Sequence, residues 1–176
     1  MMKKLLLIVA VGSVLASATA TAADDIPATL NISGSVQDST GSCAIELSRS
    51  LVHLPNQDVA SLPEQGTFLP DAVARDAVSA MLTGSNCSGV ALNFIGNAAG
   101  DGSALSNADE GSAAAKGVGV GIYDAAGEII MPNVSSRYAM AGVNNYPFHL
   151  AMVKLKNQSP APGSVQSSLT IQIDRM

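Results

Sequence analysis

The chain has 176 residues, of which 47% are hydrophobic, 13% are charged and 3% are aromatic. This hydrophobic content is too high for a disordered chain and is sufficient to build a core. The formal net charge is −5 at pH 7. An acidic chain with so few Lys and Arg lacks the positive charge that neutralises phosphates, so we exclude nucleic acid as a partner.

Residues 1–23 have the three zones of an export signal. Two lysines near the start precede an apolar stretch at 5–15, and small residues follow it. The apolar stretch is interrupted by Gly and Ser, so it is shorter than the ~20 consecutive apolar residues that a transmembrane helix needs. Cleavage after Ala22 and cleavage after Ala23 fit the pattern equally well. We expect an exported chain with one domain.

An alternating segment, residues 24–37, follows the export signal directly. Apolar and polar residues take turns along it, which predicts an extended strand with one buried face. The apolar positions are Ile26, Ala28, Leu30, Ile32, Gly34 and Val36. We call residues 24–37 the arm, and we expect the domain itself to span residues 38–176.

The sequence contains two cysteines, Cys43 and Cys87. Pairing is expected because exported chains reach oxidising compartments, where disulfides persist. Closing a loop of this size stabilises a fold by about 4 kcal/mol in the chain-entropy model. The alternative, two buried free thiols, is less compatible with an export signal.

The first half of the domain contains two clear strand candidates. Residues 44–52 and residues 90–95 are apolar runs that predict strands. Between them, residues 54–70 contain three prolines, which predicts an irregular crossover because proline cannot donate to a strand ladder. Residues 71–81 fit either a strand or a short helix, and the alternation in their second half favours the strand.

The second half reads as further short strands separated by turns. Residues 96–116 are small and polar and are expected to form a long loop. A strand at 118–123 is followed by a hairpin turn at 124–127 that leads into another strand. Residues 146–155 and residues 169–173 are the remaining strand candidates. Many short strands with frequent turns predict an all-β sandwich.

Candidates for catalysis or metal binding are few. His53 and His149 are the only histidines, and each is expected to be a surface or strand residue rather than a ligand. The alternating glycines at 117–121 lack the spacing and the following helix of a nucleotide loop, so we interpret them as a glycine-lined strand face. Residues 107–111 lack the spacing of a calcium loop. We therefore expect no enzymatic activity, no cofactor and no metal.

The order of these features resembles the type 1 fimbrial subunits (pilins) of the chaperone–usher pathway. The resemblance covers nearly all of the exported chain. It rests on the alternating arm before the first cysteine, on the second cysteine, on Gly-Val-Gly-Val-Gly-Ile-Tyr-Asp at 117–124, and on Pro-Gly-Ser-Val at 162–165 before a last strand. Arg175 is next to last, where subunits of this family commonly have an aromatic residue.

The resemblance implies an incomplete immunoglobulin-like β-sandwich that lacks one strand and is completed by donor-strand complementation. A periplasmic chaperone would first fill the open groove, and at the outer-membrane usher the arm of another subunit would replace it. The donor positions would be the six apolar residues of the arm. The strand that contacts the chaperone and forms the acceptor groove would contribute Leu169, Ile171 and Ile173.

We therefore expect a structural subunit of a cell-surface fimbria, exported through the periplasm, that polymerises by donor-strand exchange and contributes to cell adhesion. One alternative is a monomeric secreted β-sandwich binding module, in which the arm folds back onto its own chain as an edge strand. Another is a minor adaptor or tip-associated subunit. A tip adhesin with its own sugar-binding domain would need a second domain, which this length does not hold. The sequence leaves open whether the subunit is a shaft or an adaptor subunit.

Overall fold

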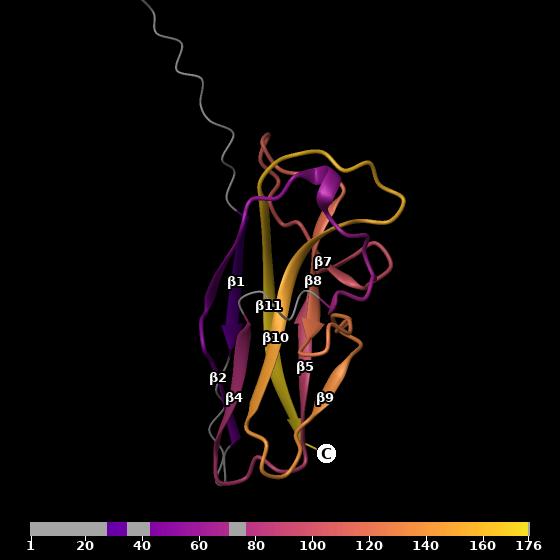
Figure 1. Cartoon of the computed structure of the whole chain (residues 1–176). Coiled ribbons are helices and arrows are strands. Elements are labelled where there is room, and N and C mark those ends of the chain that lie inside the picture. The colour runs from indigo at the N-terminus through magenta and orange to yellow at the C-terminus, as the bar shows by residue number, and fades with distance from the viewer. Residues whose placement is uncertain (1–27, 35–42, 71–76, 176) are drawn as a thin grey trace, which may run out of the picture.

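The computed structural model describes residues 28–34, 43–70 and 77–175. The export signal, with Ile26 and Val36 of the arm, lies outside the described residues. Two β-sheets pack face to face along their length (Figure 1). The strands are β1 (Ala28–Gly34), β2 (Cys43–Leu47), β3 (Leu51–Leu54), β4 (Val78–Gly84), β5 (Val90–Gly96), β6 (Ala98–Ala99), β7 (Ala104–Ser106), β8 (Val118–Asp124), β9 (Ser136–Tyr138), β10 (Asn145–Lys154) and β11 (Val165–Arg175).

Sheet A has the strand order β3-β1-β11-β5-β9, and sheet B has the order β2-β4-β10-β8-β7-β6. Helix in the described part of the chain is limited to the single 3-10 turn η1 (Val59–Ser61). Two packed, mainly antiparallel sheets are the architecture of immunoglobulin-like domains. The predicted all-β sandwich is thereby confirmed.

The core lies between the two sheets and is built from alternating residues of each strand. Along β4, Val78, Ala80 and Leu82 are buried while their neighbours are less so, which confirms the strand preferred at the end of 71–81. Phe94 of β5 and Phe148 of β10 meet edge to face with ring centroids 5.6 Å apart. This aromatic pair joins sheet A to sheet B and is worth roughly 1 kcal/mol beyond its burial.

The prediction of one strand at 44–52 is wrong, because the chain changes sheet there. β2 pairs with β4 in sheet B, whereas β3 pairs with β1 in sheet A. The change occurs at three exposed polar residues, Ser48, Arg49 and Ser50. The backbone N–H of Ser48 donates to the carbonyl of Ser79 at 2.9 Å, and the Ser48 hydroxyl accepts from the Ser79 N–H at 2.9 Å. These bonds are the last ones between this segment and β4, and after them the chain crosses to sheet A and forms β3.

Two other predictions need correction. Residues 96–116 are not a continuous loop, because β6 and β7 form a small hairpin that extends sheet B beside β8. The turn after β8 is present, with Asp124 Oδ1 accepting from Ala126 and Glu128 N–H groups at 2.9 Å. The strand predicted after it is reduced to a single bridge between Tyr123 and Ile129. The short strand β9 was not predicted, since its three residues carry no periodic pattern.

A second, smaller core covers the outer face of sheet B. Tyr123 is fully buried there, and burial raises the pKa of its hydroxyl to about 12. Its ring lies over Gly121, where an added Cβ would lie 2.6 Å from the Tyr123 hydroxyl oxygen. The glycine face of β8 thus makes room for a side chain that packs against the outside of the sheet.

The buried Gln65 of the crossover also lies at this outer core. Its side chain donates to the Ala99 carbonyl at 2.7 Å and accepts from the Lys156 N–H at 3.2 Å.

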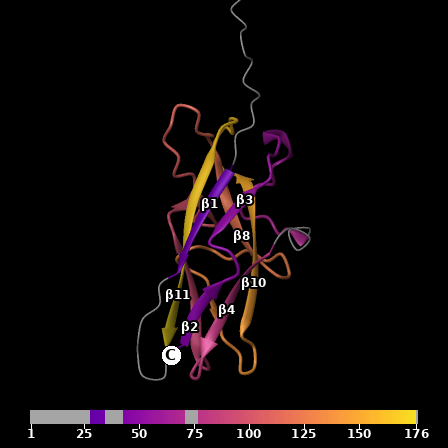
Figure 2. The ribbon, with the colours of Figure 1, turned by 90° about the vertical axis from the view of Figure 1, so that its left-hand side faces the viewer.

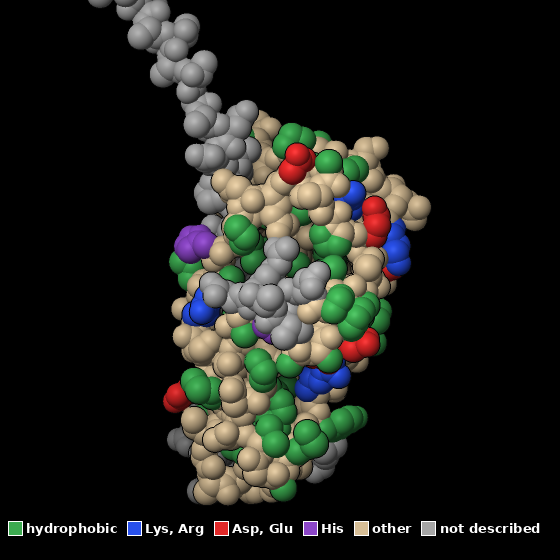
Figure 3. All heavy atoms as spheres, viewed as in Figure 1, with side chains coloured by type: hydrophobic (Ala, Val, Ile, Leu, Met, Phe, Trp, Pro, Cys, Tyr) green, Lys and Arg blue, Asp and Glu red, His purple; other side chains and the backbone are tan. Residues whose placement is uncertain are grey.

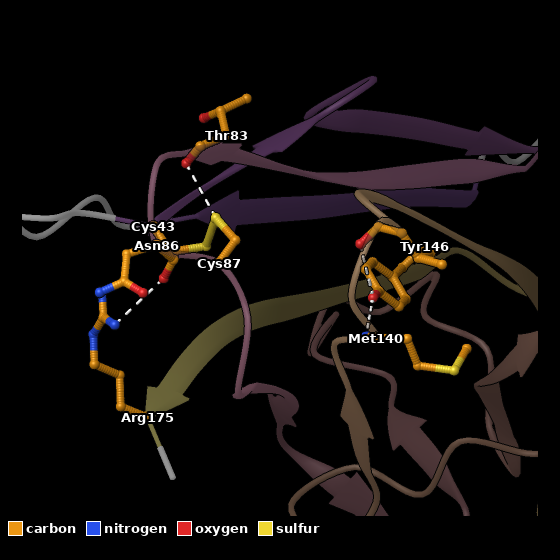
Figure 4. The surroundings of a disulfide bond; sticks show 8 residues. Cys43, Thr83, Asn86, Cys87, Met140, Tyr146 and Arg175 are labelled. Atoms are coloured by element: carbon orange, nitrogen blue, oxygen red, sulfur yellow. Dashed lines mark hydrogen bonds between the residues drawn. A yellow bond between two sulfur atoms is a disulfide. The ribbon is translucent and has the colours of Figure 1, made fainter.

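The predicted disulfide is present. It joins Cys43, the first residue of β2, to Cys87, which lies just beyond β4, across a sequence separation of 44 (Figure 4). Nearby, the Arg175 guanidinium donates to the carbonyl of Asn86 at 3.3 Å. The disulfide and the end of β11 therefore lie at the same end of the sandwich, which we call the disulfide end.

Removing the disulfide should destabilise the fold strongly. The double substitution Cys43→Ala with Cys87→Ala is expected to lower the free energy of unfolding by about 4 kcal/mol, because the unfolded chain regains the entropy of the open loop. Urea unfolding of both proteins measures the change. A difference below about 1 kcal/mol would contradict this account.

The ion pair between Asp101 and Lys156 should make part of the stability depend on pH. The Lys156 ammonium lies 2.7 Å from Asp101 Oδ2, and mainly this contact, with hydrogen bonds from Ser103, lowers the pKa of Asp101 to about 2. Because the folded pKa lies below the unfolded one, the contribution is present above about pH 4 and is lost as the pH falls toward about 2. The difference in the free energy of unfolding between the wild type and Asp101→Asn, measured by urea unfolding at each pH, should therefore shrink over this range. A difference that stays constant would show that the Asp101–Lys156 pair does not make stability depend on pH.

Candidate functional site: the groove that holds β1

β1 is an interior strand of sheet A. It pairs in parallel with β11 through seven register pairs, from Ala28 opposite Val165 to Gly34 opposite Ile171. On its other side it pairs antiparallel with β3, from Ala28 opposite Leu54 to Asn31 opposite Leu51. Figure 2 shows β1 running alongside both strands. Among the named strands of the described residues, β1 and β11 form the only parallel pair.

The apolar alternation of the arm matches the buried face of β11. Val165, Ser167, Leu169 and Ile171 are each at most 4% exposed. Their register partners in β1 are Ala28, Leu30, Ile32 and Gly34, in that order. The polar residues Thr29, Asn31 and Ser33 are opposite positions of β11 that are exposed or half-buried. The register is therefore the one that the sequence pattern demands.

The groove has two walls that β1 alone connects. β11 forms one wall, and β3, with the buried Val52, forms the other. Near the end where β11 begins, a cavity of about 110 Å³ is lined by Leu62, Val118, Met152 and Val165, among others. Without β1, both walls would be sheet edges with unpaired backbone groups next to the core, which is a costly arrangement.

Residues predicted for the site come together only in part. Leu169 and Ile171 are buried and lie opposite Ile32 and Gly34. Ile173 lies beyond the end of β1, pairs with Leu92 of β5 and is half-buried. The family resemblance implies that the arm fills the groove of a neighbouring copy, whereas in this single chain β1 lies in the groove of its own chain. It is an interior strand there, not the edge strand of the monomeric alternative.

Sequence reasoning missed the second wall and the loop that supports the first. The apolar run at 44–52 predicts a single strand, so it does not reveal β3 as a separate element. The side chain of Asn107, in the loop before β8, hydrogen-bonds the backbone of Ser164 and Gln166 at 2.9 Å. The Ser164 hydroxyl donates to Asp109, and chiefly this bond lowers the pKa of the Asp109 carboxyl. An Asx-type pattern at 107–109 is the only signal that could have pointed to this contact.

The histidines and carboxylates do not form a chemical centre in the described residues. His149 is buried in β10 opposite Tyr123, and His53 is exposed in β3. No group of three or more His, Cys, Asp or Glu able to hold a metal ion occurs in this part of the chain. On the face shown in Figure 3, charged side chains are scattered among hydrophobic and other side chains rather than gathered into one patch. The feature that distinguishes the molecule is the groove.

Comparison with known proteins agrees with this architecture. The model of the fimbrial protein family matches residues 30–174, which include the arm strand β1 from Leu30 onward and all of the remaining strands apart from Arg175. The chain belongs to the fimbrial protein family. Family membership makes it a subunit of surface pili, which assemble from pilin subunits.

Among solved structures, the pilin resembles the P pilus rod subunit PapA, with 13% sequence identity and a TM-score of 0.47. The alignment covers 81% of this chain and 99% of that one. No curated protein matches the sequence. Within the described residues, the pilin has no helix that is long and apolar enough to cross a membrane.

The register of the groove predicts opposite results for two neighbouring substitutions. Ile32→Asp places a charge at the register position of the buried Leu169, whereas Ser33→Asp places the same charge opposite the half-buried Thr170. Ile32→Asp should lower the free energy of unfolding by about 2–5 kcal/mol, and Ser33→Asp by less than about 1 kcal/mol. Hydrogen exchange of β11 amides should rise in the first variant only, and equal exchange in both would show that the register is wrong.

Proposed function

We propose that this pilin is a structural subunit of a chaperone–usher fimbria that polymerises by donor-strand exchange. In this proposal the domain is an incomplete immunoglobulin-like sandwich, and the arm of one copy fills the groove of the next. The donor residues are Ile26, Ala28, Leu30, Ile32, Gly34 and Val36. A periplasmic chaperone fills the groove during export, the outer-membrane usher is where the exchange occurs, and the finished fimbria contributes to cell adhesion.

One observation carries the proposal. The groove accepts a strand whose apolar residues fall at every second position, in register with the buried residues of β11. Backbone pairing and this alternation are all that the groove requires of its occupant. An identical arm from another copy satisfies the same requirement, so the groove cannot distinguish the arm of its own chain from that of a neighbour by sequence.

Strand direction is what distinguishes the two arms. β1 and β11 both run toward the disulfide end, where Cys43 continues the chain (Figure 1). A chain's own antiparallel arm covering the same stretch would end beside Val165, roughly 33 Å from the disulfide end at ~3.3 Å per residue. The nine residue steps from Gly34 to Cys43 span about 30–32 Å when fully extended. A chain can therefore fill its own groove in parallel with slack in this connection, whereas the antiparallel direction would stretch the connection to its limit and so favours another copy.

Direction also decides between a closed dimer and a fibre. A parallel arm leaves the groove at the disulfide end, where the acceptor's own arm joins its domain. Two copies could therefore exchange arms and close a dimer. An antiparallel arm leaves at the opposite end and keeps the donor's groove free for a third copy, which gives an open chain. Antiparallel pairing is also slightly more stable per residue than parallel pairing. Both points favour antiparallel exchange as the route to a fimbria.

A second candidate function is the monomeric secreted binding module. The observation that favours it is that β1 occupies the groove of its own chain and pairs with β11 from Val165 to Ile171. The two functions differ in whether the arm can be exchanged. The exported chain, purified without a chaperone, is expected to take up a labelled synthetic peptide of residues 24–37 if its arm is exchangeable. A protease-resistant monomer that never takes up the peptide would rule out exchange and favour the module.

Deleting the arm should produce a chain terminator. A variant without residues 24–37, co-expressed with its chaperone, can still accept an arm but has none to donate. Adding it to intact chains should shorten the fimbriae as its share rises, because each capped end stops growing. Electron microscopy of the mixtures measures the lengths, with Ser33→Asp as the control that keeps the arm. Assembly of fimbriae from the deleted chain alone would rule out donor-strand exchange.

A further inference from the structure

The first residues of β11 have no strand neighbour on the side away from β1. β5 pairs with β11 only from Leu169 to Arg175, whereas β1 pairs with it from Val165 to Ile171. Beside residues 164–168, the loop 106–116 takes the place that β5 leaves vacant. Half of this groove wall is therefore held by a loop rather than by a strand.

The loop imitates a strand by combining backbone groups with one side chain. Its backbone reaches Ser164, which forms a parallel bridge with Ala114 and donates its N–H to the Ala113 carbonyl at 2.9 Å. The Gln166 N–H donates to Asn107 Oδ1 at 2.9 Å, and the Gln166 carbonyl accepts from the Ala108 N–H at 2.7 Å. The Ser164 carbonyl accepts from Asn107 Nδ2 and from the Ala115 N–H, both at 2.9 Å. The amide of Asn107 thus supplies the donor and the acceptor that the peptide group of a neighbouring strand would supply.

Asn107 uses its whole hydrogen-bonding capacity in this position. Besides the two bonds to β11 and the residue before it, Nδ2 donates to the Ala115 carbonyl at 3.1 Å and Oδ1 accepts from the Asp109 N–H at 3.0 Å. An amide side chain has two donor hydrogens and two acceptor lone pairs, and all four are engaged. Asp109 in turn accepts from the Ser164 hydroxyl. The contact is therefore a built bridge between the loop and the start of β11.

We propose that Asn107 is a positioning residue that keeps the first half of β11 extended as a groove wall while one arm replaces another. This inference rests on the proposed function. When β1 leaves, residues from Leu169 onward still have β5 beside them in the sheet, but residues 164–168 have only the loop beside them, besides the bond from the Ser167 hydroxyl to the Ser106 carbonyl of β7 in the other sheet. A wall that stays extended can form backbone bonds with an incoming arm without first paying the entropy of ordering those residues.

The experiment compares two isosteric substitutions in the full-length exported chain. Asn107→Asp keeps the acceptors, removes both N–H donors and sets a negative charge against the Ser164 and Ala115 carbonyls. Asn133→Asp is the matched control, because the Asn133 amide also clamps the end of a strand. It donates to the Gly96 carbonyl at 2.8 Å and accepts from the Gly96 N–H at 3.2 Å, at the end of β5. The readouts are uptake of a labelled peptide of residues 24–37 and hydrogen exchange along β11.

Asn107→Asp is expected to lower peptide uptake about thirtyfold, since two hydrogen bonds worth about 1 kcal/mol each are lost, while Asn133→Asp stays within about twofold of wild type. Exchange should rise at residues 164–168 and not at 169–175. A substitution that merely loosened the fold would raise exchange at 169–175 as well. Exchange that rises along all of β11, or uptake by Asn107→Asp equal to or above that of wild type, overturns the positioning role.

Ser164→Ala serves if Asn107→Asp fails to fold. It removes only the hydroxyl that donates to Asp109, and it should lower uptake by about threefold, as expected for one weaker bond. Uptake unchanged in this variant would also overturn the role. Failure of the proposed function gives a different result, because the wild type itself would then take up no peptide. Uptake by wild type with no effect of either substitution removes the inference about Asn107 and leaves the proposed function standing.

Discussion

The need of β11 for a partner on each edge governs the rest of this structure. β11 is the central strand of sheet A, and its alternate residues from Val165 to Ile171 are buried against sheet B. One edge is satisfied by β5 and by the loop that carries Asn107. The other edge is satisfied only by β1, which comes from the arm ahead of the disulfide-closed domain. Sheet A therefore becomes continuous through a segment that the rest of the fold does not enclose.

The connection between β1 and Cys43 ties self-completion to one strand direction. Because both strands point to the disulfide end, a lone chain can satisfy β11 in the parallel sense, using its own residues. That arrangement covers the exposed edge and so limits uncontrolled association. The antiparallel arrangement makes the better ladder per residue, and in the proposed function it is the one that the arm of another copy adopts. Under that proposal, strand direction separates the closed groove of a single chain from the growing fimbria.

The arm and the last strand were predictable from sequence because both show strict alternation, and alternation fixes which face is buried. The pairing of Cys43 with Cys87 followed from the export signal. Periodicity does not say which strands are neighbours, so the division of residues 44–52 between two sheets was missed. For the same reason the sequence could not say whose groove the arm fills. Leu30 and Ile32 match Ser167 and Leu169 equally well within one chain or between two.

The contact between Asn107 and β11 was invisible for a different physical reason. Strand prediction rests on residue pattern along the backbone, whereas here a side-chain amide, distant in sequence from β11, performs the work of a backbone peptide. The loop backbone pairs with Ser164 through the bridge at Ala114, whereas Gln166 is held by the Asn107 amide together with the Ala108 N–H. Because only part of this pairing comes from the backbone, no strand pattern marks the loop in the sequence. Backbone and side-chain bonds together keep the start of β11 extended where the β5 ladder ends.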